Sequence, residues 1–315
     1  MLDRRSLLAA LATLPVARRA RAAESDTVRI GYQKNGILVV AKQQGRIEER
    51  LAPLGRTVRW VEFSFGPPMV EALAVDGLDF GLLGDAPPIF AQARGSDLVY
   101  VAALEGGGSG SGILLPKGST LRSLADLKGK RVAFAKATSA HNLTVAALEK
   151  AGLAYTDIEP VLLAPADAAA AFARGSVDAW TIWDPYLAIA EAGEGVRALA
   201  YATAIAPQNN FLLARRAFVE GQGPALVAAL AALDEVAAWC RQNRGAVAEL
   251  LSQGTGVPLA ATRRAVDRND YVIGPMTDRI VAAQQQVADR FHALKLIPKP
   301  VRIADAVWTA PARNG

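Results

Sequence analysis

Residues 131–152, RVAFAKATSAHNLTVAALEKAG, decide the fold of this chain. Residues 131–135 alternate in polarity, which predicts a short buried strand. From about His141 the apolar residues recur at helical spacing, and Gly152 follows where a glycine usually ends a helix. Residues 136–140 are mostly small and join the two elements. The stretch therefore predicts a strand whose loop leads directly into a helix N-terminus, the unit of an α/β fold.

The loop before this helix carries two hydroxyl residues, Thr138 and Ser139. A helix N-terminus presents unpaired backbone N–H groups and the positive end of the helix dipole. Together with uncharged hydroxyl donors, these groups can bind an oxyanion. Ser139 capping the helix with its own side chain explains the same pattern without a ligand. Both interpretations are open at this point.

A second copy of the same plan lies earlier in the chain. Residues 77–87 read GLDFGLLGDAP, and residues 175–185 read GSVDAWTIWDP. In each copy two aspartates stand six residues apart, Asp79 with Asp85 and Asp178 with Asp184. A strand expected at residues 28–33, followed by one helix at 37–50, precedes the first copy, as strand 131–135 and its helix precede the second. The repeat predicts two similar α/β lobes.

The lobes are expected to use residues 24–112 with 206–315 and residues 113–205, respectively. In parallel sheets the binding loops follow the C-terminal ends of the strands. Two facing lobes would thus bring the loops at 33–36, 84–87, 137–140 and 183–185 into one cleft, which is where small-ligand sites usually lie. The last third returns one strand at 211–214 and is then mostly helical, with helices at 225–242, 244–253, 258–268 and 277–294. This part shows no cluster of residues typical of a catalytic or binding site and is interpreted as scaffold for the first lobe and a possible docking face.

The N-terminus has the features of an export signal, assigned to residues 1–23. Arg4 and Arg5 precede the apolar run 7–17, which Pro15 interrupts and which is too short to span a membrane. The twin arginine favours export by the twin-arginine route, and the general secretory route is the alternative. Removing this segment, which carries five arginines and one aspartate, leaves a net charge of about +1 from the +5 of the whole chain. The basic charge therefore indicates no nucleic-acid partner.

Cysteine and histidine are scarce. The single Cys240 excludes an intramolecular disulfide and lies in a helical pattern typical of a buried thiol. His141 and His292 are 151 positions apart, so a metal site and a metal cofactor are not expected.

Several motifs resemble one known family. These are GDAPPIFAQ at 84–92, DLKGK at 126–130, VDAWTIWDP at 177–185 and LKLIPK at 294–299, and matching stretches run from residue 28 to 308. They are similar to the periplasmic aliphatic sulfonate-binding proteins of ABC importers. The resemblance implies the two-lobed type II periplasmic binding protein fold. It also implies a monomer that captures an aliphatic sulfonate and delivers it to an ABC transporter permease.

The chain departs from that family at the anion loop. The family usually reads glycine-serine-asparagine at the positions of Ala137, Thr138 and Ser139, whereas Lys136 and His141 are kept. A sulfonate carries one permanent negative charge and only acceptor oxygens, so its site needs donors and little countercharge. Asp85 and Asp184 would repel it and are expected to cap helices or bond across the cleft. The ligand-binding residues predicted from the resemblance and the loops are Gln33, Gly84, Asp85, Ala86, Ser111, Thr138, Ser139, His141, Trp183, Asp184 and Asn210.

Other functions remain as alternatives at this stage. Nitrate, taurine or another small anion would suit the same donors. Some desulfinases share the fold, but such enzymes need a nucleophilic cysteine or histidine in the cleft. Cys240 and His292 lie in C-terminal helical patterns, and only His141 is near a predicted loop. The sequence therefore favours a binding protein over an enzyme.

Overall fold

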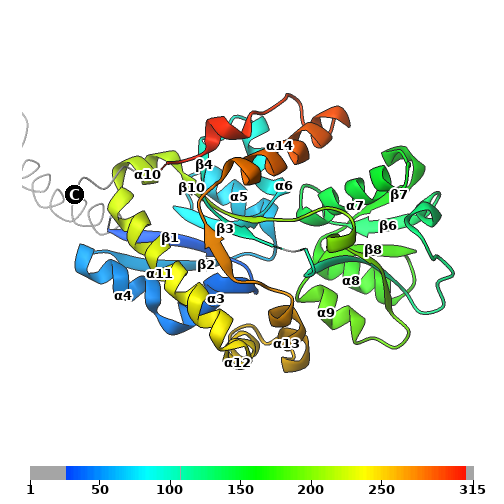
Figure 1. The fold of residues 1–315 in the computed structure, drawn as a ribbon, viewed down its shortest axis with the longest axis horizontal. Coiled ribbons are helices and arrows are strands. Elements are labelled where there is room, and N and C mark those ends of the chain that lie inside the picture. Colours follow the sequence, from blue (N-terminus) through cyan, green and yellow to red (C-terminus); the bar gives the residue numbers. More distant parts are fainter. Residues whose placement is uncertain (1–25, 107, 310–315) are drawn as a thin grey trace, which may run out of the picture.

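The computed structural model describes residues 26–106 and 108–309 and shows two lobes side by side (Figure 1). The predicted export signal lies outside the described residues. Each lobe is built around its own mixed sheet, with strand order β11-β4-β10-β3-β1-β2 in lobe 1 and β7-β6-β8-β5-β9 in lobe 2. The chain changes sheet between Glu105 and Ser111 and returns between Tyr201 and Asn210.

Lobe 1 combines the first and last parts of the chain. Its elements are β1 (Thr27–Tyr32), α3 (Gly36–Gln44), α4 (Arg46–Leu51), η1 (Ala52–Leu54), β2 (Thr57–Glu62), α5 (Gly66–Ala74), β3 (Phe80–Gly84), α6 (Ala86–Ala93), β4 (Leu98–Glu105), β10 (Asn210–Arg215), α10 (Arg216–Gly221), α11 (Gly223–Gln242), α12 (Arg244–Thr255), α13 (Leu259–Asp267), β11 (Val272–Gly274), α14 (Asp278–Ala293) and η5 (Ile303–Ala306). One apolar cluster joins the sheet to α3, α4, α11 and α12, and a second joins it to α5, α6 and α14. Lobe 1 is thus a helix–sheet–helix sandwich.

Lobe 2 is continuous in sequence. Its elements are β5 (Ser111–Leu115), η2 (Leu124–Leu127), β6 (Arg131–Phe134), α7 (Ser139–Lys150), η3 (Tyr155–Asp157), β7 (Glu159–Leu162), α8 (Pro165–Ala173), β8 (Ala179–Trp183), α9 (Tyr186–Glu191), β9 (Arg197–Tyr201) and η4 (Ala202–Ala204). Residues of α7 pack into the cluster on one face of the sheet, and residues of α8 and α9 pack into the cluster on the other.

The internal repeat is real in three dimensions. Strands β1, β2 and β3 are parallel neighbours in lobe 1, as β6, β7 and β8 are in lobe 2, and each sheet then adds an antiparallel strand. The first aspartate of each repeat has the same task. Asp79 accepts hydrogen bonds from the backbone and guanidinium of Arg29, and Asp178 does the same for Arg131. Each pair ties the first strand of its repeat, β1 or β6, to the residue before the third strand, β3 or β8.

Two predicted elements differ in detail. The helix expected at 37–50 is two helices, α3 and α4, because Gly45 between them adopts the left-handed conformation with φ of 67°. The helix after residues 136–140 begins at Ser139 rather than His141. Its expected end is confirmed, since Gly152 has φ of 70° and the N–H of Leu153 reaches back to the carbonyl of Leu148.

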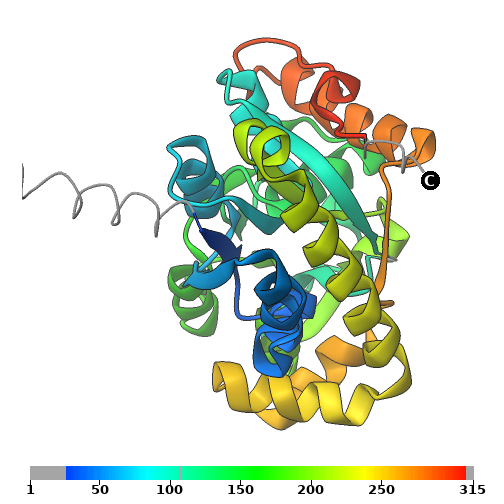
Figure 2. The same cartoon turned by 90° about the vertical axis from the view of Figure 1, so that its left-hand side faces the viewer.

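The helices expected in the last third all form, with no end shifted by more than two residues. Figure 2 looks onto lobe 1 and shows α11 and α12 lying against α3 and α4. Helix α11 is the one described helix that is long and apolar enough to cross a membrane. Its buried face, which includes Leu226, Leu233 and Cys240, belongs to the lobe 1 core. Helix α11 is accordingly a core helix.

Candidate functional site

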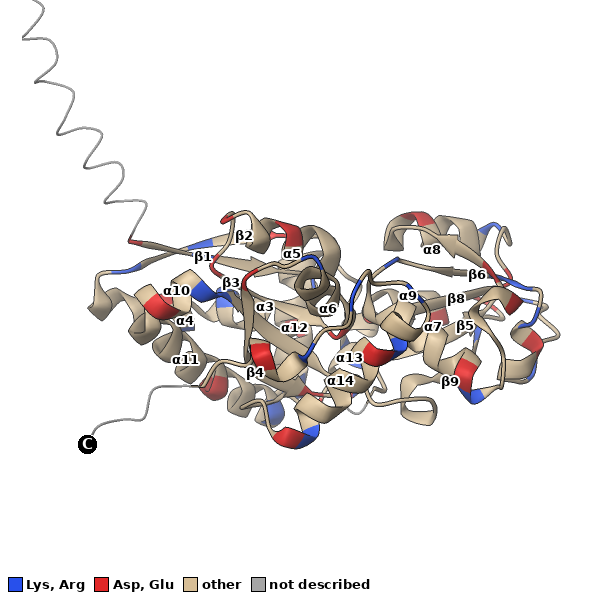
Figure 3. Ribbon diagram, turned by 90° about the horizontal axis from the view of Figure 1, so that it is seen from above, with Lys and Arg blue, Asp and Glu red and all other residues tan. Residues whose placement is uncertain are grey.

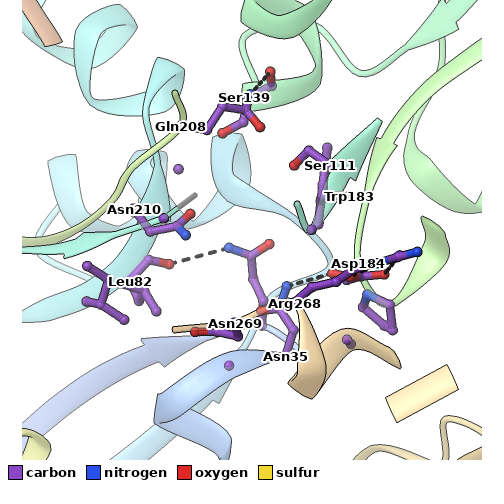
Figure 4. A pocket seen from close by; sticks show the side chains of 18 of the residues that line it. Asn35, Leu82, Ser111, Ser139, Trp183, Asp184, Gln208, Asn210, Arg268 and Asn269 are labelled. Carbon is purple, nitrogen blue, oxygen red and sulfur yellow. Dashed lines mark hydrogen bonds and ion pairs between the residues drawn. The ribbon is translucent and has the colours of Figure 1, made fainter. Parts of the chain in front are cut away.

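A cavity of about 180 Å³ lies between the lobes (Figure 4). It is lined by the ends of β1, β3 and β8, by the start of α7 and by the segment after α13. Of the predicted ligand-binding residues, the cavity brings together Gln33, Gly84, Ser111, Thr138, Ser139, Trp183, Asp184 and Asn210. The other three, Asp85, Ala86 and His141, are buried behind its wall. Residues from all four predicted loops therefore meet at one cavity.

The N-terminus of α7 faces this cavity without a side-chain cap. Thr138 occupies the N-cap position in an extended conformation, but its side chain does not bond to the helix amides. Its hydroxyl instead donates to the carbonyl oxygen of Ala135 at 2.6 Å, so its proton is already used. Ala137 has φ of 59°, a conformation that glycine adopts without strain and that alanine adopts only at some cost. The glycine-to-alanine departure noted in the sequence thus falls at a position that requires a left-handed backbone.

Ser139 touches the opposite lobe. A Cβ atom placed on Gly84 would lie only 2.0 Å from the Ser139 Oγ, so these two loops meet because residue 84 has no side chain. The Ser139 hydroxyl is therefore directed at lobe 1. Gln208, on the segment that returns to lobe 1, donates its side-chain amide to the Ser139 carbonyl at 2.9 Å. The backbone amides at the start of α7 remain as the donors available to a ligand.

Asp85 lies directly behind this contact and is 2% exposed. Its carboxylate accepts a hydrogen bond of 2.6 Å from Asn142 on α7, across the lobe boundary. Burial raises the pKa of Asp85, and the nearby side chains of Ser139 and Asn142 oppose this effect. Asn142 in turn accepts from Arg290 of α14 at 2.8 Å. Asp85 thus bonds across the cleft, as expected, and does not line the cavity.

Asp184 both caps a helix and bonds across the cleft. Its carboxylate accepts from the backbone N–H of Ala188 in α9 at 3.0 Å, and from Arg268 of lobe 1 at 3.3 Å. Its backbone carbonyl accepts from the side chain of Asn35 at 3.1 Å. Burial raises the pKa of Asp184 to about 6, and the charge of Arg268 opposes that rise. The second aspartates of the two repeats therefore both link the lobes.

His141 is part of an aromatic cluster. Its ring stacks on Phe134 at a centroid distance of 5.0 Å and also contacts Phe90 and Phe291 of lobe 1. Its Nδ1 accepts from the backbone N–H of Ala137 at 3.2 Å, which supports the anion loop from behind. Burial lowers the pKa of His141 to about 4, and Lys136 adds to the effect. A neutral histidine therefore holds the loop, and no contact with the cavity is present.

The cavity also contains residues that sequence reasoning missed. Arg268, Asn269 and Tyr271 line it, although the last third was interpreted as scaffold and a possible docking face, with no cavity residue expected beyond Asn210. Folding places α13 against α9 of lobe 2. Local sequence patterns do not predict such a contact between distant segments. Gln208 was missed for the same reason. Asn35 lay inside a predicted loop and could have been named from it.

The residues that line the cavity are of types that bind a ligand through hydrogen bonds and apolar contact. None of the described residues lining the cavity is a cysteine or a histidine. Cys240 is fully buried in lobe 1, and burial raises the pKa of its thiol to about 12. Among residues 26–106 and 108–309, no group of three or more His, Cys, Asp or Glu side chains could hold a metal ion. The wall offers backbone amides, neutral amide side chains and two aromatic residues, Trp183 and Tyr271.

Comparison with known proteins identifies the family. The sequence profile of the NMT1-like family matches residues 21–253. The chain belongs to the NMT1-like family. It is 42% identical to an aliphatic sulfonates-binding protein of Escherichia coli (strain K12), over 98% of this chain and 97% of that protein.

Solved structures of this family agree. The periplasmic aliphatic sulphonate binding protein SsuA of Escherichia coli superposes with a TM-score of 0.84 at 42% identity, covering 92% of this chain and 94% of that one. SsuA from Xanthomonas axonopodis pv. citri, bound to MOPS, gives 0.84 at 40% identity over 90% and 98%. These relatives are sulfonate-binding proteins, and the SsuA of Escherichia coli is periplasmic. They confirm the resemblance, the two-lobed fold and the choice of binding protein over enzyme.

Proposed function

We propose that this protein binds an aliphatic sulfonate in the cavity between its lobes and delivers it to an ABC transporter. The observation that carries the proposal is the uncapped N-terminus of α7, which opens onto the cavity opposite the Gly84 turn. The names of its close relatives support the same ligand class. Hydrogen bonds to a charged group contribute about 1.5–3 kcal/mol each, so three such bonds, less the cost of association, suffice for micromolar affinity.

Both cations that line the cavity already have carboxylate partners. Lys34 lies 3.4 Å from Glu62, and Arg268 is paired with lobe 2. A monoanion without protons is suited to such a wall, because backbone donors satisfy its oxygens without a free countercharge. Gln33, Ser111 and Asn210 can add polar contacts around it, with Trp183 beside its organic part.

The proposal includes a periplasmic location and a monomeric protein that meets its permease in the closed form. Lys and Arg positions (blue) and Asp and Glu positions (red) are interspersed along the ribbon of both lobes (Figure 3). Arg4 and Arg5 support export of the precursor by the twin-arginine route. Replacing both by lysine should leave the precursor in the cytoplasm, and normal periplasmic recovery would indicate the general secretory route instead.

Isothermal titration calorimetry tests the ligand. Ethanesulfonate and propanesulfonate should bind with micromolar or better affinity, whereas nitrate and sulfate should bind at least tenfold more weakly. Ser139→Asp places a carboxylate at the start of α7 and should abolish sulfonate binding in a folded protein. The matched control is Ser176→Asp, at an exposed site of the same lobe. Wild-type affinity in Ser139→Asp would remove the α7 N-terminus from the site, and tighter nitrate binding would reassign the ligand.

A further inference from the structure

One side-chain cluster reaches the cavity through Asp184 and Arg268, with Glu191 and Tyr201 behind them, and has a charge that the sulfonate site alone does not require. Arg268 of lobe 1 donates to Glu191 of lobe 2 at 2.6 Å and lies 3.3 and 3.5 Å from the two carboxylate oxygens of Asp184. Tyr201 donates to the other oxygen of Glu191 at 2.6 Å and lies under the Arg268 guanidinium. We call Asp184, Glu191, Tyr201 and Arg268 the Arg268 cluster.

The cluster is largely shielded from solvent and negatively charged. The Asp184 and Glu191 side chains are 11% and 10% exposed, and the Arg268 side chain is 19% exposed. One guanidinium faces two carboxylates, so the ionised cluster has a net charge of −1. Because both carboxylates hold Arg268, this arginine is not free to bind an anionic group of a ligand.

The cavity is thus polarised from end to end. Figure 4 shows Ser139 and Gln208 at one end, and Arg268, Asp184 and Asn35 at the other. The start of α7 supplies the positive end of a helix dipole, and the Arg268 cluster supplies net negative charge. A ligand held by its sulfonate at α7 therefore directs the rest of the molecule toward the cluster.

We propose that Asp184 and Glu191 make the cavity selective against ligands with a second negative charge. The inference rests on the proposed function, because it takes the sulfonate to sit at α7. Sulfonates with a neutral or cationic far end are accepted, whereas sulfonates that also carry a carboxylate are rejected by repulsion in a site of low dielectric constant.

Two ligands of similar shape isolate the charge. The far end of 2-methylpropane-1-sulfonate is a branched neutral group, and that of sulfoacetate is a carboxylate. At pH 7.5 and low salt, calorimetry on the wild type should show at least tenfold tighter binding of the neutral-ended ligand. Glu191→Gln keeps an acceptor for Arg268 but removes one charge. It should reduce the ratio of the two dissociation constants, that of sulfoacetate over that of 2-methylpropane-1-sulfonate, about five- to tenfold. Glu191→Asp keeps the charge and should preserve the ratio.

Glu194→Gln is the matched control. Glu194 lies three residues further on and its side chain is 86% exposed, so this variant removes the same charge in solvent and should leave the ratio unchanged. If Glu191→Gln weakens both ligands equally, the cluster only joins the lobes and the inference is overturned. Equal wild-type affinity for the two ligands also overturns it, with sulfonate binding intact. Failure of 2-methylpropane-1-sulfonate to bind the wild type would overturn both this inference and the proposed function.

Discussion

The contact between Gly84 and Ser139 gives a sharp test of cleft closure. In Gly84→Ala the new methyl carbon would lie 2.0 Å from the Ser139 Oγ and 3.3 Å from its Cβ. The first distance is far inside normal contact, so either Ser139 rotates or the lobes separate. Overpacking of this kind costs about 1–3 kcal/mol. Since Gly84 does not adopt a positive φ, alanine brings no backbone strain, and the cost falls on the closed arrangement.

Calorimetry and small-angle scattering measure this cost. The affinity of Gly84→Ala for propanesulfonate should fall about 5- to 150-fold, and its ligand-bound radius of gyration should exceed that of the wild type. Adding Ser139→Ala removes the 2.0 Å contact and should restore most of the affinity. The control is Gly110→Ala, whose methyl would meet the Asp184 carboxylate at an ordinary 3.4 Å. Wild-type affinity and an unchanged scattering profile in Gly84→Ala would refute the closed geometry.

Two further predictions concern stability. Burial lowers the pKa of His141 from 6.5 to about 4, so its stabilising effect is present above pH 6.5 and is lost toward pH 4. Burial raises the pKa of Asp184 from 3.8 to about 6, so the stabilising effect of Asp184 on the folded state is present below pH 3.8 and is lost as pH rises through 6. Each effect contributes about 3 kcal/mol to the free energy of unfolding, and the two oppose each other. Because His141→Gln removes only the histidine contribution, the free energy of unfolding of this variant should rise by about 3 kcal/mol relative to that of the wild type as pH falls from 7 to 4. Urea titrations measure this difference, and parallel pH profiles of the two proteins would contradict it. For the paired aspartates, Asp79→Asn should cost about 3–5 kcal/mol of unfolding free energy, because its side chain is 5% exposed and bonds to both Arg29 and Arg215. Asp178→Asn, at a side chain 33% exposed with Arg131 as its partner, should cost about 1 kcal/mol, and equal losses would show that burial does not set the cost.

The sequence by itself determined the two lobes and the loop through which the start of α7 reaches the cavity. These features rest on local patterns: alternating strands, helical spacing, and the aspartates of residues 77–87 and 175–185. The unpaired N–H groups at the start of a helix belong to the helix's own first turn, so their position follows from the local sequence that starts the helix. For this reason the start of α7 and the Gly84 turn could be named before any contact was known.

Tertiary structure decided which polar groups reach the cavity. Thr138 and Ser139 both looked like donors to a ligand, but their hydroxyls are directed at Ala135 and at the Gly84 turn. His141 kept its place in the motif, yet aromatic residues of both lobes bury it.

Arg268 is 84 residues from Asp184 in the chain, and the two meet only because α13 packs on α9. Periodicity reports the environment of a segment along its own axis and carries no information on which distant segment packs against it. The positive end of the cavity could therefore be predicted from the sequence, whereas its negative end required the assembled lobes.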